Sequence, residues 1–213
     1  MIDGVRSADS ALKYGVPQGS VLGPILFTMY TQPLVSEIKR FGLNYHFYAD
    51  DSQIYGSCSP ENIKDLTKTL EMCVSSVKTW MNRNKLVLNG DKTEIVLTGS
   101  ANAKAKVNQD CICLDNNTVT ISKAAKNLGI VFDCDLSMSS AINQLTQKLY
   151  FEIHNISKIR HFLSNDIATL LVNTLVLSKL DYCNALFYGA KKELINKLQI
   201  AQNSAARLIC KKK

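Results

Sequence analysis

The chain has 213 residues, of which 46% are hydrophobic and 20% are charged, and its formal net charge is +7. This balance is ordinary for a folded globular protein and excludes fibrous and intrinsically disordered classes. No apolar stretch of about 18 residues is free of charges, so we expect no membrane span.

The charge is unevenly distributed along the chain. Residues 1–147 hold 14 basic and 14 acidic side chains, whereas residues 148–213 hold 11 basic and 4 acidic ones. The whole excess therefore lies in the last third. Such an excess either serves nucleic-acid binding or covers solvated helix faces, and composition alone leaves both open.

The first third of the sequence predicts a loop, a helix and a hairpin. Residues 15–24 read G-V-P-Q-G-S-V-L-G-P, which is typical of a shaped loop, and Pro24 suits the first turn of a helix. Apolar residues at helical spacing from Ile25 to Ile38 predict that helix. Alternation over residues 43–55 then predicts a hairpin with Asp50 and Asp51 at its bend.

The middle of the chain mixes one long helix with short strands. Ser59, Pro60 and Glu61 form a typical helix start, with a cap residue, a proline and an acid in the first turn. An apolar face continues this helix as far as Trp80. The small, polar residues 99–110 predict a surface loop. Strands are expected at 86–88, 94–97, 119–121 and 128–132.

From Ser137 onward the apolar pattern is purely helical. One stripe runs from Ile142 to Ile156, a second helix is expected to begin at Ser164 as its cap, and a third carries residues 194–208. The sequence therefore predicts an α+β chain in two parts. Residues 1–136 form a mixed part and residues 137–213 form a helical part.

Asp50 and Asp51 form the clearest chemical signal in the sequence. Two carboxylates side by side repel each other, so either one takes up a proton or a cation compensates them. A divalent cation such as Mg²⁺ is the usual partner where hard oxygen ligands gather. The alternative is two solvated acids in a turn.

Several motifs together resemble those of reverse transcriptases. Residues 15–27, G-V-P-Q-G-S-V-L-G-P-I-L-F, and residues 48–51, Y-A-D-D, resemble motifs B and C of that family, the first in its LINE-type (non-LTR retrotransposon) form. Residues 88–94 are similar to motif D, and Asn127–Ile130 to the following primer-grip strand. Residues 177–184 and 198–207 are similar to the end of the same polymerases. The motifs stand in the family's order and cover almost the whole chain.

The resemblance implies a fold and an activity. It implies half of a polymerase palm over residues 1–136 and a thumb-like helical region over 137–213. The implied reaction is RNA-templated DNA synthesis from deoxynucleoside triphosphates, assisted by two Mg²⁺ ions. The implied partners are an RNA template and a DNA primer.

The resemblance also assigns roles to individual residues. Asp50 and Asp51 are expected to bind the metal ions. Lys92 either places its charge near the leaving pyrophosphate or is an exposed turn lysine, and Tyr48 either contacts the primer or packs. Nucleotide or template contacts are implied for Gly15, Pro17, Gln18, Gly19, Ser20 and Tyr48, and the primer grip for Leu128 and Gly129. Duplex phosphates are expected to meet Lys158, Arg160, Lys179, Lys191, Lys192 and Arg207, unless these basic residues only cover solvated helix faces.

One expected element of the family is missing from the sequence. Members carry a further metal-binding aspartate on a strand upstream of motif B, but only 14 residues precede Gly15, and neither Asp3 nor Asp9 lies in an apolar strand pattern. We therefore interpret the chain as the carboxyl-terminal part of a polymerase, with little or no activity alone. The alternative is a non-enzymatic remnant that still binds nucleic acid.

The seven cysteines show no C-x-x-C spacing and no suitable histidine partner, which argues against a zinc site. We interpret them as reduced, small apolar residues. This interpretation predicts an intracellular, reducing compartment, either the nucleus or the cytoplasm.

Overall fold

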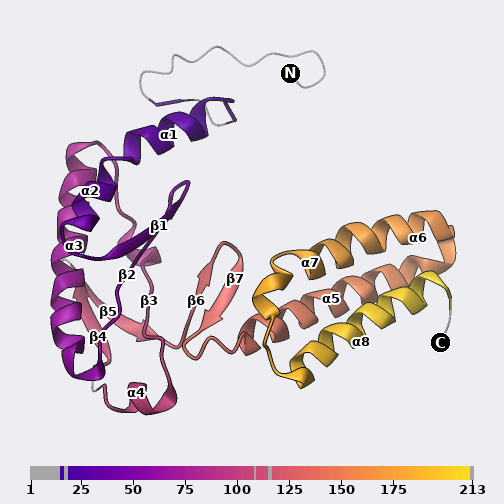
Figure 1. Cartoon of the computed structure of the whole chain (residues 1–213). Helices are drawn as coiled ribbons and strands as arrows, with labels where there is room; N and C mark the ends of the chain where they lie inside the picture. Colours follow the sequence, from indigo (N-terminus) through magenta and orange to yellow (C-terminus); the bar gives the residue numbers. More distant parts are fainter. Residues whose placement is uncertain (1–14, 17–18, 108, 115–116, 212–213) are drawn as a thin grey trace. The chain divides into compact units, whose positions relative to one another are not determined.

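The computed structural model describes residues 15–16, 19–107, 109–114 and 117–211 (Figure 1). The chain is mixed helix and sheet, consistent with the expected α+β class. It divides into two compact units, Met1–Asp91 with Ile112–Thr118, and Lys92–Cys111 with Val119–Lys213. This division differs from the expected one at residue 136, because the strand that ends at Asp133 packs on the first helix of the helical region.

The first unit joins two short helices, a hairpin and a long helix. Its elements are α1 (Gly23–Thr31), α2 (Leu34–Lys39), β1 (Asn44–Tyr48), β2 (Asp51–Tyr55), a 3-10 turn (Pro60–Asn62) and α3 (Ile63–Arg83). Buried side chains of α2 pack with those of α3 and with Leu43, which precedes β1. This core supports the hairpin that carries the two aspartates.

The helix predicted from Ile25 to Ile38 is two helices. Pro24 lies in the first turn of α1 as expected, but the helix ends before Pro33, because proline cannot donate the next backbone hydrogen bond. Only the second helix buries its apolar residues: Leu34 and Ile38 are fully buried, whereas no described residue of α1 is.

The second unit contains short strands. They are β3 (Ile95–Val96), β5 (Asn117–Ser122, in this unit from Val119), β6 (Ala124–Asn127) and β7 (Ile130–Asp133), with α4 (Ala101–Ala105) inside the expected surface loop. β3 runs parallel to β5, and β6 and β7 form an antiparallel hairpin in which Asn127 pairs with Ile130. β4 (Cys111–Leu114) and β6 were not expected from the sequence.

One expected strand does not form. Residues 86–88 have no ladder partner among the described residues, and Val87 is 88% exposed. The 3-10 turn Gly90–Lys92 follows instead of a hairpin turn. An apolar triplet alone does not make a strand without a neighbouring backbone to pair with.

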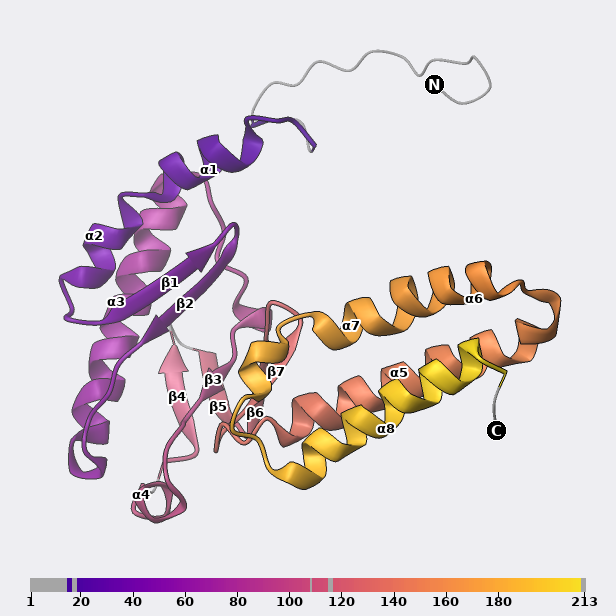
Figure 2. The same cartoon turned by 45° about the vertical axis from the view of Figure 1, so that its right-hand side comes forward.

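Every described element after Asp133 is helical. These are α5 (Ser139–Ile159), a 3-10 turn (Arg160–Phe162), α6 (Asn165–Val172), a π-helical segment (Asn173–Leu177), α7 (Ser178–Asp181), a 3-10 turn (Asn184–Phe187) and α8 (Lys192–Ile209). Ser164 caps α6 as expected, accepting a hydrogen bond from the backbone N–H of Ile167. α5 and α8 lie side by side (Figures 1 and 2). Ala201 and Ala205 of α8 are buried in the core of the helical region, where small side chains allow close packing.

Asp133 connects the strands of the second unit to the helical region. Its carboxylate accepts hydrogen bonds from the Ser137 hydroxyl and from the backbone N–H groups of Met138 and Ser140, at 3.0, 3.2 and 3.3 Å. Burial acts to raise the pKa of this carboxyl, but the donors outweigh burial and hold its pKa below the ordinary value. The ionised side chain therefore satisfies backbone donors at the start of α5.

The cysteines fit their expected role as small apolar residues only in part. None of the seven cysteines forms a disulfide, but only Cys73 is buried, and burial raises the pKa of its thiol to about 11. The apolar interpretation thus fits Cys73 and fails for the exposed cysteines 58, 111, 113 and 210.

In the part of the chain that the structure describes, no helix has the length and apolar character needed to cross a bilayer.

Candidate functional site

The two aspartates lie at the bend of the β1–β2 hairpin, as the sequence predicts. Tyr48 pairs with Asp51, so Ala49 and Asp50 form a two-residue bend. Ala49 has a φ of 52°, a left-handed conformation that is strained for a residue with a side chain. Both aspartates are exposed. The exposed carboxylates of Asp50, in the bend, and Asp51, the first residue of β2, therefore stand beside the strained residue Ala49, and such strain gathers at functional sites.

Tyr48 lies beside this bend and is 61% exposed. Its ring does not belong to the core of the first unit, which takes up Tyr45, Phe47 and Ile54 from the same hairpin. The sequence left two roles open for Tyr48, and the structure does not show the first of them, packing in that core. A contact with the primer stays a prediction.

The segment Gly15–Ser20 precedes α1, and the structure describes four of its six residues, namely 15, 16, 19 and 20. Gly15 and Gly19 have φ values of 78° and 86°, which favour glycine. A Cβ atom at either position would have nothing within 4 Å, so glycine is favoured there by the backbone conformation and not by contact with neighbouring side chains. The Ser20 hydroxyl accepts a hydrogen bond from the Gly23 N–H at 3.0 Å. The predicted contacts at Pro17 and Gln18 fall outside the described residues.

Lys92 and the primer-grip residues belong to the second unit. Lys92 is exposed at the end of the turn Gly90–Lys92, and both of its suggested roles stay open. Leu128 and Gly129 are the two central residues of the β6–β7 hairpin, with φ values of 44° and 86°. The first is unusual for a bulky side chain. The carbonyl of Leu128 accepts a hydrogen bond from the Tyr182 hydroxyl at 2.8 Å.

Arg160 does not fit its expected role as a phosphate contact. It is only 6% exposed, and its guanidinium donates to the carbonyls of Leu208, Ile209 and Leu163 and to the side chain of Asn165. Two of these acceptors are carbonyls of the last turn of α8, where helix geometry leaves carbonyl groups without the usual backbone donor four residues on. The corrected role is structural, because a guanidinium used in this way has no surface to offer a phosphate.

The other basic residues of the helical region differ in their availability. Lys179 forms an ion pair with Glu152 of α5. The remaining four, Lys158, Lys191, Lys192 and Arg207, are exposed. Lys191 and Lys192 stand at the start of α8, whereas Arg207 stands in its last turn and Lys158 in the last turn of α5. An 18-residue helix is about 27 Å long, so these cations form two separate groups.

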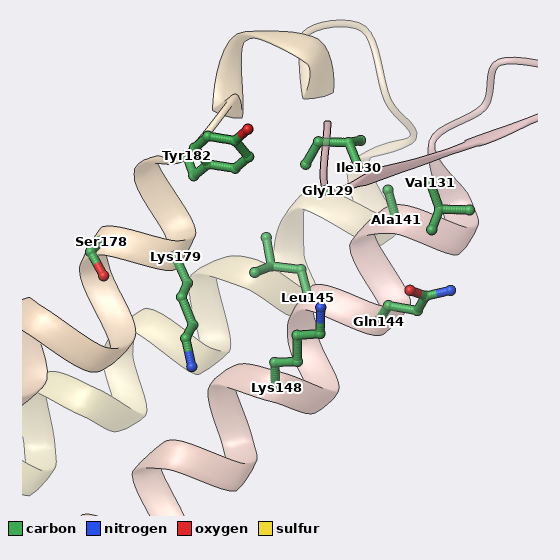
Figure 3. A pocket seen from close by; sticks show the side chains of 10 residues that line it. All are labelled: Gly129, Ile130, Val131, Ala141, Gln144, Leu145, Lys148, Ser178, Lys179 and Tyr182. Atoms are coloured by element: carbon green, nitrogen blue, oxygen red, sulfur yellow. The ribbon is translucent and has the colours of Figure 1, made fainter. Parts of the chain in front are cut away.

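A cavity of about 330 Å³ lies in the second unit, between the β6–β7 turn and the helices (Figure 3). Residues of β7, α5 and α7 surround it, with Gly129 and Tyr182 on one side. Of the lining residues, sequence reasoning had proposed roles for Gly129 and Lys179 and had placed Tyr182 in a family motif, but it singled out neither Gln144 nor Lys148. A usable signal was present, because Gln144 and Lys148 are polar residues one helical turn apart.

Comparison with known proteins agrees with the motifs. The family model described as "Reverse transcriptase (RNA-dependent DNA polymerase)" matches residues 1–132. The chain is 24% identical, over 216 residues, to the RNA-directed DNA polymerase from mobile element jockey of Drosophila melanogaster, covering 98% of this chain and 23% of that protein. It is 24% identical over 217 residues to the jockey polymerase of Drosophila funebris, covering 97% and 23%.

A further relative is the probable RNA-directed DNA polymerase from transposon BS of Drosophila melanogaster, 26% identical over 226 residues, with 95% of this chain and 23% of that protein covered. No solved structure matches the chain. The chain thus spans about a quarter of the length of these relatives. The match of the family model over more than half of the chain confirms the resemblance seen in the motifs, and the chain belongs to the reverse transcriptase family.

Proposed function

We propose that the chain supplies part of the active centre of an RNA-directed DNA polymerase, with Asp50 and Asp51 as carboxylate ligands of Mg²⁺. The observation that carries this proposal is that the exposed carboxylates of Asp50 and Asp51 adjoin at the hairpin bend, directly after the strained residue Ala49. Carboxylate oxygens are the ligands that Mg²⁺ prefers. When bound, the metal would stabilise the charge that develops on the transferred phosphate and on the attacking 3′ oxygen.

The two carboxylates form an incomplete donor set. Among the described residues, no group of three or more aspartate, glutamate, histidine or cysteine side chains could hold a metal ion. The chain also spans only 23% of the jockey polymerase. We therefore propose that the polymerase completes this metal site with a carboxylate from outside the described residues. Metal ligands must be held to fractions of an ångström, so the chain alone should polymerise poorly or not at all.

The other proposed contacts with nucleotide and nucleic acid are those that the family motifs imply. We propose that the loop residues Gly15, Pro17, Gln18, Gly19 and Ser20 meet nucleotide or template, with Tyr48 beside the primer end. Lys92 would neutralise the leaving pyrophosphate, and the turn of Leu128 and Gly129 would hold the primer. The mixed part would then serve as a palm and the helical part as a thumb.

Basic residues of the helical part are proposed to contact duplex phosphates. The four exposed residues Lys158, Lys191, Lys192 and Arg207 remain candidates after the correction of Arg160. Lys191 and Lys192 stand at the amino end of α8, where a cation gains nothing from the helix dipole, so helix stability does not explain them. Lys158 and Arg207 stand near carboxyl ends, where the dipole offers an alternative reason for their charge.

The test of polymerase function places the chain in a complete enzyme. The matched segment of the jockey polymerase is replaced by this chain, and primer extension on an RNA template is measured with Mg²⁺. We expect extension that falls by orders of magnitude on Asp50→Ala and is unaffected by Asp65→Ala, an exposed acid of α3. A folded chimera whose extension tolerates Asp50→Ala would refute the role of Asp50.

The alternative function is a non-enzymatic nucleic-acid-binding protein. The specific observation in its favour is that the described residues show only two clustered carboxylates, while the charge excess lies in the helical region. The two functions differ in the chimera, which extends primers only if the chain retains its polymerase role. In the isolated chain, extension above background that Asp50→Ala abolishes would instead show that the site is complete.

A further inference from the structure

Lys104 and Cys134 meet in the second unit, although 30 positions separate them in the sequence. The Lys104 ammonium donates a hydrogen bond to the Cys134 sulfur, with 3.1 Å between Nζ and Sγ. The Asp135 carboxylate accepts a hydrogen bond from the Cys134 thiol at 3.2 Å and lies 3.9 Å from the Lys104 ammonium. An amine and a sulfur are therefore in contact beside a carboxylate.

The backbone positions both ends of this contact. Ser100 caps α4, the helix that carries Lys104. The Cys134 N–H donates to the Lys123 carbonyl at 2.9 Å, and the Cys134 carbonyl accepts from the Gly99 N–H at 3.3 Å. The stem of Lys104 runs past Gly99, where an added Cβ atom would stand 3.8 Å from Cγ of the lysine. The same short segment thus binds the backbone of the cysteine and directs the lysine toward its sulfur.

Both side chains are within reach of a small solute. The side chain of Lys104 is 24% exposed and Cys134 is half-buried. The hydrogen bond to the Cys134 sulfur and the nearby charges of Asp135 and Asp133 hold the pKa of Lys104 above its ordinary value, although burial acts in the opposite direction. Lys104 is therefore an ammonium at neutral pH. What distinguishes Cys134 is this nitrogen beside its sulfur.

A nitrogen beside a sulfur changes the outcome of oxidation. Peroxide converts a cysteine thiolate to a sulfenic acid, which then condenses with a neighbouring thiol to a disulfide or with a neighbouring nitrogen to a sulfenamide. None of the seven cysteines is paired in a disulfide, whereas Nζ of Lys104 already touches the Cys134 sulfur. Condensation with the nitrogen needs only a small approach of two side chains that are in place.

We propose that hydrogen peroxide joins Lys104 to Cys134 through a covalent N–S bond. The thiolate sulfur first attacks peroxide, so that an S–O bond forms, the O–O bond breaks and hydroxide leaves. The hydroxide takes one proton from the ammonium and becomes water. The neutral Nζ then attacks the sulfenic sulfur, the N–S bond forms, the S–O bond breaks, and the oxygen leaves as a second water. The sulfur is oxidised by two electrons, and the peroxide is reduced.

The bridge tethers α4 to the junction between β7 and α5. Cys134 directly follows Asp133, whose carboxylate holds the start of α5. Thiols reverse the oxidation, so in the reducing compartment expected from the cysteines the tether persists only while peroxide is raised. It goes beyond the proposed function, because neither Lys104 nor Cys134 has a role there.

The test treats the whole 213-residue chain with hydrogen peroxide and maps its peptides by mass spectrometry. The expected product is one pair of peptides joined through Lys104 and Cys134, lighter by about 2 Da than the two free peptides together, because two hydrogen atoms are lost. Dithiothreitol should separate the pair. Circular dichroism checks that each protein used is folded.

Two variants identify the nitrogen. Lys104→Arg retains the positive charge, but a guanidinium does not lose its proton and cannot attack the sulfur. The bridge should therefore be lost, while dimedone should still trap a sulfenic acid at Cys134. Lys106→Gln removes an exposed lysine two positions further along the same segment and should form the bridge in the wild-type yield.

The joined pair in the wild-type chain and in Lys106→Gln, together with its absence in Lys104→Arg, would support the bridge. A sulfenic acid or disulfide at Cys134 of the wild-type chain without the joined pair overturns it, because the sulfur was then oxidised and the amine did not react. An unmodified Cys134 under conditions that oxidise the exposed Cys58 and Cys210 also overturns it. These measurements involve no polymerisation, so their failure leaves the proposed function intact.

Discussion

The buried guanidinium of Arg160 should stabilise the helical region strongly. It donates to four oxygen atoms at 2.6–2.9 Å, two of them on carbonyls at the end of α8. Arg160→Ala removes every one of these bonds and takes the guanidinium donor from four part-buried acceptors at once. We expect the free energy of unfolding to fall by about 3–4 kcal/mol, which is comparable to the removal of one partner from a buried polar network.

The measurement is urea denaturation of the chain followed by far-ultraviolet circular dichroism. With a denaturant dependence of about 2 kcal/mol per molar urea, the transition of the helical unit should shift by about 1.5–2 M. Hydrogen exchange at the carboxyl end of α8 adds a local measurement, because the loss should be greatest where Leu208 and Ile209 lose their donor.

Two further variants separate geometry from charge. Arg207→Ala removes the same kind of side chain from an exposed position of α8 and should cost less than about 0.5 kcal/mol. Arg160→Lys retains the charge but lacks the planar array of donors, so it should recover only a minor part of the loss. If Arg160→Ala and Arg207→Ala shift the transition equally, the buried network does not stabilise the unit and the reasoning fails.

Three other predictions follow from the second unit. The folded-state pKa of Asp133 is depressed, so the stability that its ionised carboxylate contributes is complete above a pH of about 4 and is lost as the pH falls through the folded pKa. Asp133→Asn should lower the free energy of unfolding by about 1–2 kcal/mol at pH 7 and flatten the fall of stability in acid. An unchanged pH profile of stability would contradict this role. Leu128→Asn should raise the free energy of unfolding by up to about 1 kcal/mol, because asparagine tolerates a φ of 44° better than leucine. Leu128→Ile should lower the free energy of unfolding. If thermal melts rank the two variants in the reverse order, the turn is not strained at Leu128. Tyr182→Phe should cost about 0.5–1 kcal/mol and speed hydrogen exchange in the β6–β7 hairpin, since Leu128 loses its hydroxyl donor; unchanged exchange would show that the bond does not hold the turn.

Local sequence signals predicted the elements that depend on near neighbours. The alternation before Asp50 was sufficient for the β1–β2 hairpin, and Ser164 was sufficient for the start of α6, because a hairpin register and a helix cap involve residues only a few positions apart. The motifs around Gly15 and Asp50 were sufficient for the family, which the family model confirms. The roles of the individual site residues stay predictions.

Tertiary structure decided what depends on distant neighbours. Residues 86–88 have strand composition but find no backbone to pair with, and Arg160 has the composition of a phosphate contact but meets the end of α8, which lies some fifty residues away in the sequence. The division into units likewise follows the packing of β7 on α5, not the change in composition near residue 136. The sequence by itself determined the family and the carboxylate-bearing hairpin, because both are written in short consecutive motifs. Only the fold determined which basic side chains remain free and where the cavity lies, because burial and partners are set by residues that meet across the chain.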